Sequence, residues 1–284
     1  MGILNEEQRK KYVELLKTND IDKIKQFLMD SVEEGTLIYK YCRGLVRDFN
    51  TLKEEKIFLS NAYNFNDPFD CAYLVNKRSK RAYSEDEREL AFHEYLEQEK
   101  ADQESKRRTN ATFVACFSER CDSSAMWGYY SADHKGMCIG YDLRELIDKF
   151  GIMPVIYSED LPLLEDVEGE PLYISLVTKS DEWKHEMEWR IVKYDKGKEG
   201  APGVKVEEIL PKEIIIGSKE KETCKLNAIS RKNNVKSDLL YCDVAQLIDW
   251  GRRIKSRNRI RIYSYDLSRS SYSMIKKEWK GIYT

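Results

Sequence analysis

The sequence predicts an α+β fold built from mixed, mainly antiparallel sheets. Short β-prone runs and short helical patterns follow one another without the regular strand–helix rhythm of a doubly wound parallel sheet. The chain has 284 residues, which is enough for one large hydrophobic core. We therefore expect an N-terminal helical extension over residues 1–34, a single α+β core domain over 35–266 and a C-terminal tail over 267–284.

The first part of the chain predicts helices, then strands. Between Asn5 and Val32, apolar residues recur at three- and four-residue steps, and a break near Asn19 separates two short helices. The next predicted elements are a strand over 36–41, a helix over 49–55, a strand over 56–60 and a loop over 64–70. The loop combines turn formers and a proline with aromatic side chains, which predicts an ordered conformation.

In the rest of the core domain, the sequence predicts one insertion followed by further strands. Residues 77–108 are almost continuously charged and predict a solvated helical insertion, to which we assign no chemistry. The later predicted elements are strands over 112–118, 136–141, 153–157, 188–194 and 213–217, a helix beginning within 173–178 and a polar helix reaching about Asn233.

Composition excludes several classes of protein. Lys and Arg number 48 against 50 Asp and Glu, so the chain does not coat nucleic acid or anionic lipid along its whole length. No apolar stretch reaches the roughly 18 residues of a membrane span, and the N-terminus lacks the apolar core of a secretory signal, which predicts a cytoplasmic protein without membrane contact. Seven cysteines without a C-x-x-C pair and three histidines without ligand spacing predict free thiols and no dedicated metal site.

Two aromatic segments carry candidate polar groups. In the loop, Asn66, Asp67 and Asp70 either cap backbone amides or meet a ligand, and Phe65 and Phe69 are expected to pack on the core or line a cleft. In the second segment, residues 124–136, Trp127 and Tyr130 have the spacing of a helical turn, which is typical of core packing as well as of a stacking surface. His134, beside Lys135, is either a phosphate or proton-transfer group or a satisfied structural histidine.

Glu186, Glu188 and Arg190 form the segment that is hardest to explain as scaffold. In a strand the three side chains project from one face, because side chains alternate between faces. Two adjacent carboxylates repel unless Arg190, another cation or a substrate offsets their charge. The pair either stabilises an oxocarbenium-like centre or binds a ribose hydroxyl, or it belongs to an exposed ion-paired row.

The segment 251–261 holds six basic residues and no acidic one. Its candidate nucleic-acid contacts are Arg252, Arg253, Lys255 and Arg257. An exposed edge strand explains the same pattern equally well.

Many of these segments, in their order along the chain, resemble a widespread bacterial domain-of-unknown-function family. The resemblance covers about residues 36–265 and rests on the sequences YKY at 39–41, FNDPFD at 65–70, CFS at 116–118, MWxxY at 126–130, HKG at 134–136 and ExEWR at 186–190. The opening strand and the late Glu-x-Glu are in turn similar to those of ADP-ribosyltransferase-like folds.

The resemblance implies a cleft between two small sheets that binds NAD as a substrate. It implies that Glu188, with Glu186, fixes a ribose hydroxyl and stabilises the oxocarbenium-like transition state as nicotinamide leaves. The nucleotide-binding residues assigned on this basis are Tyr39, Lys40, Tyr41, Ser60, Phe65, Asn66, Asp67, Phe69, Ser118, Trp127, Tyr130, His134 and Arg190.

The expected function is therefore ADP-ribosyl transfer to a nucleic-acid or protein acceptor, in a toxin or phage-defence effector that an inhibitor or antitoxin partner holds in check. The alternative is a non-catalytic module that binds nucleotides or nucleic acid through the aromatic residues and the segment 251–261. A third hypothesis is a metal-dependent nuclease built on Asp67, Glu186 and Glu188.

Overall fold

The computed structural model describes residues 2–72, 74–75, 96, 99–100, 103, 105–164, 173–206, 209–219, 232–233, 250, 260–271 and 273–278. Most of the predicted insertion at 77–108, most of the polar helix predicted up to Asn233 and the basic segment 251–259 lie outside these ranges. None of the described helices is long and apolar enough to cross a membrane.

The described elements confirm an α+β fold with a mixed, mostly antiparallel sheet. The helices are α1 (Glu6–Lys17), α2 (Ile21–Ser31), α3 (Val46–Lys53), α5 (Ser124–Tyr130), α6 (Leu143–Phe150) and α7 (Tyr173–Leu176), with 3-10 turns η1 (Ala62–Asn64), η2 (Asp181–Glu186) and η3 (Lys196–Lys198). The strands are β1 (Leu37–Cys42), β2 (Ile57–Asn61), β3 (Leu74–Val75), β4 (Thr112–Ser118), β5 (Met137–Asp142), β6 (Met153–Pro154), β7 (Ile156–Ser158), β8 (Leu163–Leu164), β9 (Thr178–Ser180), β10 (Glu188–Tyr194), β11 (Gly203–Val206), β12 (Glu213–Ile216), β13 (Arg261–Leu267) and β14 (Met274–Glu278).

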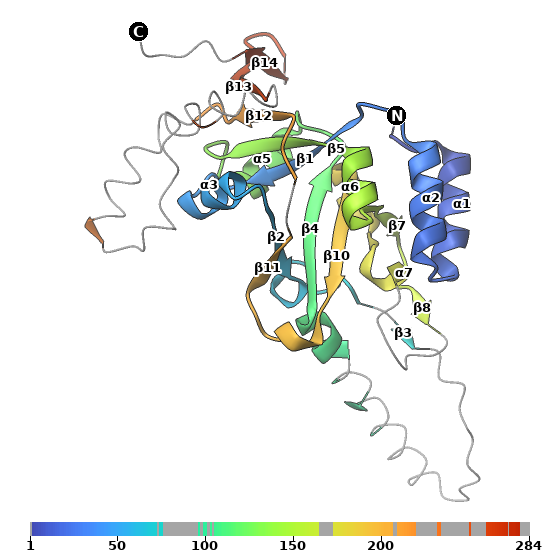
Figure 1. Ribbon diagram of the computed structural model, residues 1–284. Coiled ribbons are helices and arrows are strands. Elements are labelled where there is room, and N and C mark those ends of the chain that lie inside the picture. The colour runs from blue at the N-terminus through green and yellow to red at the C-terminus, as the bar shows by residue number, and fades with distance from the viewer. Residues whose placement is uncertain are drawn as a thin grey trace, which may run out of the picture.

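Within the described residues, one ten-stranded sheet organises the molecule. Its order is β11-β2-β4-β1-β5-β12-β13-β14, and β10 continues from β4 to the short β6. In Figure 1, β4 and β10 lie side by side at the centre, where they pair antiparallel from Ser118 and Glu188 to Thr112 and Tyr194. β12 and β13 pair in parallel, whereas the other pairs described for this sheet are antiparallel.

The sheet forks at β4. One edge of β4 pairs with β10, and the other edge pairs with β2 at Phe113 and Val114 but with β1 at Ser118. Along the described strands, the bridges to β1 and β2 skip Ala115–Phe117 on this edge. Because β1 and β2 meet β4 at opposite ends, a gap opens between them.

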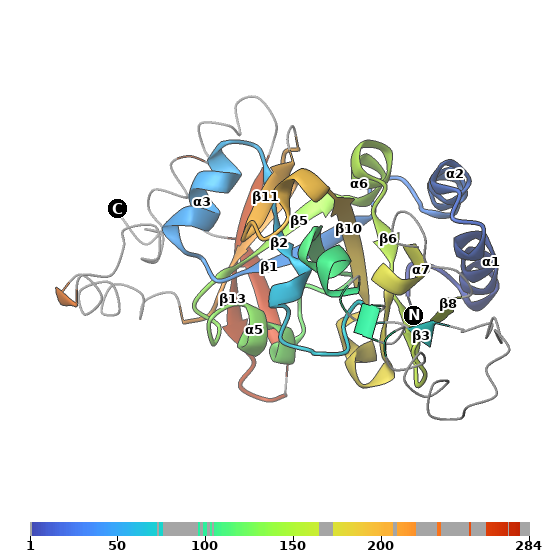
Figure 2. The same ribbon diagram turned by 90° about the horizontal axis from the view of Figure 1, so that it is seen from below.

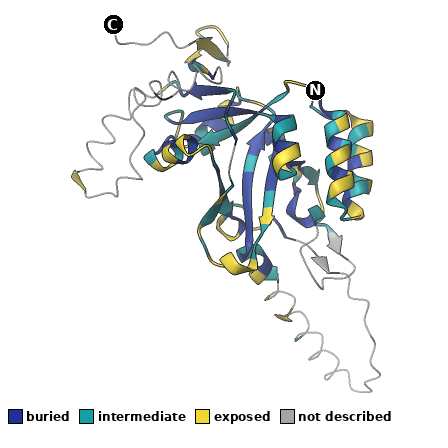
Figure 3. Cartoon of the chain, viewed as in Figure 1, coloured by how far each residue is buried: buried dark blue, intermediate teal, exposed yellow. Residues whose placement is uncertain are grey.

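The main hydrophobic core joins the N-terminal helices to the sheet. In Figure 2, α1 and α2 lie at one side of the molecule and α3 at the other. Tyr12 on α1 is buried and donates a hydrogen bond of 2.9 Å to the carbonyl oxygen of Pro154, and Leu28 on α2 shares the core cluster with Trp189. Figure 3 shows the inner faces of these helices less exposed than the outer faces. Residues predicted as an extension are thus packed on the core domain.

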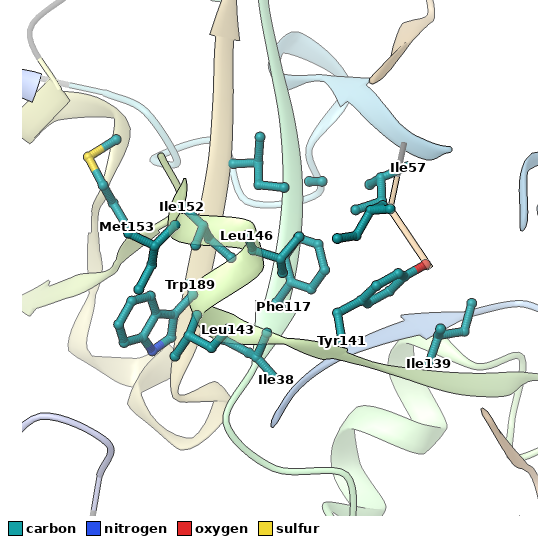
Figure 4. Close-up of a cluster of buried hydrophobic side chains, with 14 of the residues drawn as sticks. Ile38, Ile57, Phe117, Ile139, Tyr141, Leu143, Leu146, Ile152, Met153 and Trp189 are labelled. Atoms are coloured by element: carbon teal, nitrogen blue, oxygen red, sulfur yellow. The ribbon is translucent and has the colours of Figure 1, made fainter. Parts of the chain in front are cut away.

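Trp189, Phe117 and Leu146 meet at the centre of this core, as the close-up in Figure 4 shows. Trp189 and Ile191 on β10 both face the core, as the predicted alternation requires. Their neighbours Glu188 and Arg190 consequently project from the opposite face of the strand.

Three predicted elements differ from the structure. The strand expected over 153–157 is divided between β6 and β7, which belong to different sheets. The helix expected within 173–178 is only the four-residue α7, and β9 follows it. β14 lies in the stretch predicted as a tail, yet it pairs with β13 from Met274 to Glu278. Four of its five residues are exposed, which is why it lacks the apolar alternation of a core strand.

Candidate functional site

A cavity of about 190 Å³ lies at the fork in the sheet. Strands β1, β2, β4 and β10 all contribute to its wall, together with α5 and the loop that follows η1. The residues that line it are Tyr39, Lys40, Tyr41, Ser60, Phe65, Asn66, Asp70, Val114, Cys116, Phe117, Met126, Tyr130, Lys179, Glu186 and Glu188.

A buried ion cluster supports one wall of this cavity. Arg190 is 0% exposed and forms a two-pronged pair with Asp70, with nitrogen–oxygen distances of 2.7 and 2.9 Å. The same guanidinium also donates to both oxygens of Glu188, from Nε at 2.8 Å and from Nη2 at 3.2 Å. Its Nη1 donates to the carbonyl oxygen of Leu176 at 2.9 Å. Such fork-to-carboxylate pairing fixes both groups in orientation.

Lys179 joins the two glutamates. Its Nζ lies 2.6 Å from Glu186 and 3.0 Å from Glu188, and the side chains of all three residues are nearly inaccessible to solvent. Glu186 also accepts a hydrogen bond of 2.7 Å from the hydroxyl of Tyr130. The cluster of Asp70, Glu186, Glu188, Lys179 and Arg190 therefore carries three carboxylates and two cations, a formal charge of minus one within the cluster, and Lys40 adds a separate cation to the cavity lining.

The cations keep Glu188 ionised. Burial raises the pKa of this carboxyl, but attraction to Arg190 and Lys179 outweighs burial and lowers the pKa to about 2. Burial lowers the pKa of Lys179, and the two glutamates more than reverse that effect, so its pKa lies above the ordinary value. Burial, with Glu186 as the next cause, raises the pKa of Tyr130. The site thus presents a carboxylate, an ammonium group and a neutral phenol at neutral pH.

The backbone places Glu186 and Glu188 by different means. β10 begins at Glu188, whereas Glu186 ends the turn η2, so the predicted strand face does not extend to Glu186. Met187 between them has a left-handed φ of 46°, which turns the chain so that both carboxylates reach Lys179. Ser118 donates a hydrogen bond of 2.6 Å to the Glu186 carbonyl oxygen, and the Tyr157 hydroxyl accepts one of 2.8 Å from the Glu188 amide.

The structure brings nine of the predicted site residues to the cavity, namely Tyr39, Lys40, Tyr41, Ser60, Phe65, Asn66, Tyr130, Glu186 and Glu188. Arg190 and Ser118 lie behind this wall and hold the glutamates in place. Phe65 contacts the cluster directly, since the Arg190 guanidinium lies 5.8 Å from its ring centre.

Four other predicted site residues do not line the cavity. Asp67 accepts a hydrogen bond of 2.9 Å from the Phe69 amide, which is a turn contact, and the Phe69 side chain is 63% exposed. Trp127 is fully buried among apolar residues that include Tyr265, and it donates a hydrogen bond of 2.8 Å to the Cys121 carbonyl oxygen. The His134 ring stacks on the Trp127 ring, with 6.4 Å between the ring centres. Turn geometry thus accounts for Asp67 and core packing for Trp127, whereas Phe69 is exposed and the buried His134 Nδ1 has no hydrogen-bond partner among the described residues.

Several residues of the site were absent from the predicted set. Asp70 is predicted as a loop residue that caps an amide or meets a ligand, Cys116 belongs to the CFS segment of the resemblance without an assigned role, and Lys179 and Tyr157 are not among the predicted site residues. Two adjacent carboxylates repel each other, which predicts a cation nearby, and the structure shows that Lys179 is one such cation. Arg252, Arg253, Lys255 and Arg257 lie outside the described residues.

The family comparison covers the segment that contains most of this cluster. Residues 126–191 match the model of a family described as "Protein of unknown function (DUF2971)". This match confirms the resemblance to a domain-of-unknown-function family over that span, which runs from α5 into β10 and includes Tyr130, Lys179, Glu186 and Glu188. Neither the curated proteins nor the solved structures provide a match to the chain.

Proposed function

We propose that the cavity at the fork binds NAD and that the protein is an ADP-ribosyltransferase-like enzyme acting on a macromolecule. The observation that carries the proposal is the excess of one carboxylate over the cations within the buried cluster beside the cavity. Nicotinamide is cationic in NAD, and cleavage of its bond to ribose develops positive charge on the sugar. A fixed negative charge in a buried site stabilises such a transition state more than it does in water.

Glu188 and Glu186 retain the capacity to accept further hydrogen bonds. A carboxylate offers about four lone-pair positions. Glu186 uses two, for Tyr130 and Lys179. Glu188 accepts two bonds from Arg190 and one from Lys179, and the Cys116 thiol is a weak further donor that a ribose hydroxyl would displace. In the proposed mechanism Glu188 accepts a ribose hydroxyl and stabilises the oxocarbenium-like centre. The bonding pair leaves with nicotinamide, the acceptor attacks the sugar, and Glu186 takes the acceptor's proton.

The size of the cavity fits one half of the dinucleotide. At about 190 Å³ it is smaller than the roughly 300–1,000 Å³ of typical ligand pockets. We therefore place nicotinamide and its ribose inside, beside Phe65, and the phosphates near Lys40. The proposed partners are NAD, a nucleic-acid or protein acceptor and an inhibitor or antitoxin protein, as in a toxin or phage-defence effector.

The test is release of nicotinamide from NAD by the purified protein, with RNA, DNA or cellular protein added in turn. We expect release by the wild type, at least a hundredfold less by Glu188→Gln, and retained NAD binding in calorimetry. Glu182→Gln is the matched control, because Glu182 is an exposed carboxylate on the adjoining turn η2. Glu186→Gln provides a second variant if Glu188→Gln does not fold.

Two results would overturn this proposal. Failure of the wild type to bind NAD or release nicotinamide with any acceptor rejects NAD chemistry. Binding of nucleotide or nucleic acid without turnover favours the non-catalytic alternative.

The metal-dependent nuclease is the weakest alternative. Asp67 does not lie with Glu186 and Glu188 at the cavity. Among the described residues, no group of three His, Cys, Asp or Glu side chains is arranged to hold a metal ion.

A further inference from the structure

A second cavity, of about 270 Å³, lies beneath α3. It is bounded by α3 and by strands β1, β2, β5 and β11. Among the described lining residues, Lys40 is the one that it shares with the cavity at the fork. Nothing in the proposed NAD chemistry uses this second cavity.

The floor of the second cavity contains a tyrosine with an available hydroxyl. Tyr141 on β5 is only 2% exposed, and its ring packs edge-on against Phe117 with 6.0 Å between the ring centres. Figure 4 shows the phenol oxygen at the outer end of the ring, directed away from the centre of the core. Within the described part of the chain, no hydrogen bond to this hydroxyl is found, and it is not among the fully buried polar atoms without a partner, so it is open to a partner in the cavity.

Positive charge dominates the rim. Among the described lining residues, four cations, Lys40, Arg47, Lys56 and Lys205, outnumber the two carboxylates of Asp48 and Glu54. Both carboxylates are already engaged: Asp48 accepts a hydrogen bond of 3.0 Å from the Leu45 amide and lies 3.5 Å from Arg47, and Glu54 lies 2.8 Å from Lys205 and 3.7 Å from Lys56. The rim therefore has an excess of two positive charges, which attracts an anion.

The walls between rim and floor are apolar. Leu52, Ile57 and Ile139 line the cavity and are almost completely buried in the core. An apolar body with a few convergent polar groups is the usual composition of a small-molecule site.

We propose that the cavity beneath α3 binds a small organic anion with an apolar or aromatic body. The anionic group lies between Arg47 and Lys40, the body rests on Leu52, Ile57 and Ile139, and an acceptor atom of the ligand receives the hydrogen bond of the Tyr141 hydroxyl. This site shares Lys40 with the NAD site proposed above, and its other residues take no part in the NAD chemistry.

The experiment is a fluorescence titration of the full chain with 8-anilinonaphthalene-1-sulfonate, an aromatic sulfonate of the required chemistry. We expect saturable binding to the wild type that weakens as salt is added. Arg47→Glu should weaken binding about tenfold or more by reversing a rim charge, and Tyr141→Phe about three- to tenfold by removing one hydrogen bond. The matched controls are Arg43→Glu and Tyr129→Phe, which alter exposed residues outside the cavity lining.

The thermal unfolding midpoint separates a binding role from a structural role. Tyr141→Phe should leave the midpoint unchanged, since the hydroxyl has no partner in the described chain, while probe affinity falls. The proposal is overturned if no saturable binding occurs, or if Arg47→Glu and Tyr141→Phe bind the probe as tightly as their controls. It is equally overturned if Tyr130→Phe weakens binding and those two variants do not, because the probe then occupies the cavity at the fork.

Discussion

The two cavities contain ion pairs of similar length in very different surroundings. The Arg190–Asp70 pair at the fork measures 2.7 Å with side chains 0% and 4% exposed. The Lys205–Glu54 pair beneath α3 measures 2.8 Å with side chains 38% and 44% exposed. Buried charges depend on each other because the interior offers no water to replace a lost partner, whereas exposed charges are rehydrated. Burial, and not distance, decides how much each pair matters.

This difference also separates what the cavities can do. At the fork, five charges lock one another in orientation, which suits groups that must be held at a reacting centre. Beneath α3, the Lys205–Glu54 pair is partly exposed to water, so a ligand can replace one partner at little cost. Lys40 lines both cavities.

The largest effect is expected from removing the central cation of the buried cluster. Arg190→Met leaves Asp70 without its main partner and Glu188 with Lys179 alone, so the free energy of unfolding should fall by about 3–5 kcal/mol. Urea denaturation measures this loss. Lys193→Met, at an exposed position of the same strand, is the control and should not change stability. Equal stability of the two variants would refute the central role of Arg190.

The pH dependence of stability tests the ionisation of Glu188. Because the pKa of Glu188 falls from an ordinary 4.5 to about 2 on folding, its carboxylate stabilises the folded state above pH 4.5, and this contribution is lost as pH falls toward 2. Denaturation at several pH values should show Glu188→Gln less stable than wild type at pH 7, with the difference shrinking across this window. Glu182→Gln should follow the wild-type curve, and a constant difference for Glu188→Gln would contradict the assignment.

Sequence patterns predict the part of the fork that lies on one strand. The alternation of β10 places Trp189 and Ile191 in the core and Glu188 and Arg190 on the opposite face, as expected from a period of two. The same period fails at Glu186, because Met187 adopts a left-handed conformation that is uncommon for a residue other than glycine. No glycine or turn former at 187 signals this change.

The rest of the cluster depends on contacts between distant segments. Asp70 reaches Arg190 across 120 positions of sequence, and Lys179 comes from β9, outside the main sheet. Local periodicity carries no information about such contacts, although the repulsion between two carboxylates predicts that a cation must be nearby. The roles proposed for the residues that line the cavity stay predictions until turnover is measured.

A smaller effect is expected from the hydroxyl that supports Glu186. Tyr130→Phe removes a hydrogen bond of 2.7 Å to a charged acceptor, so the free energy of unfolding should fall by about 1.5–3 kcal/mol. Tyr129→Phe is a closely matched control, because the neighbouring Tyr129 side chain is 68% exposed. Chemical denaturation of both variants tests this contact. If they lose equal stability, the Tyr130 hydrogen bond contributes nothing particular to the cluster.

The smallest effect is expected from the exposed pair beneath α3. Lys205→Met removes the partner of Glu54, but water can solvate the remaining carboxylate, so the urea midpoint should not change measurably. Raising the salt concentration should likewise leave the stability of wild type and variant equal, since an exposed pair is already screened. A loss comparable to that of Arg190→Met would show that the second cavity is as rigidly locked by charge as the first. The cations beneath α3 would then have a structural role and would not be available to bind a ligand.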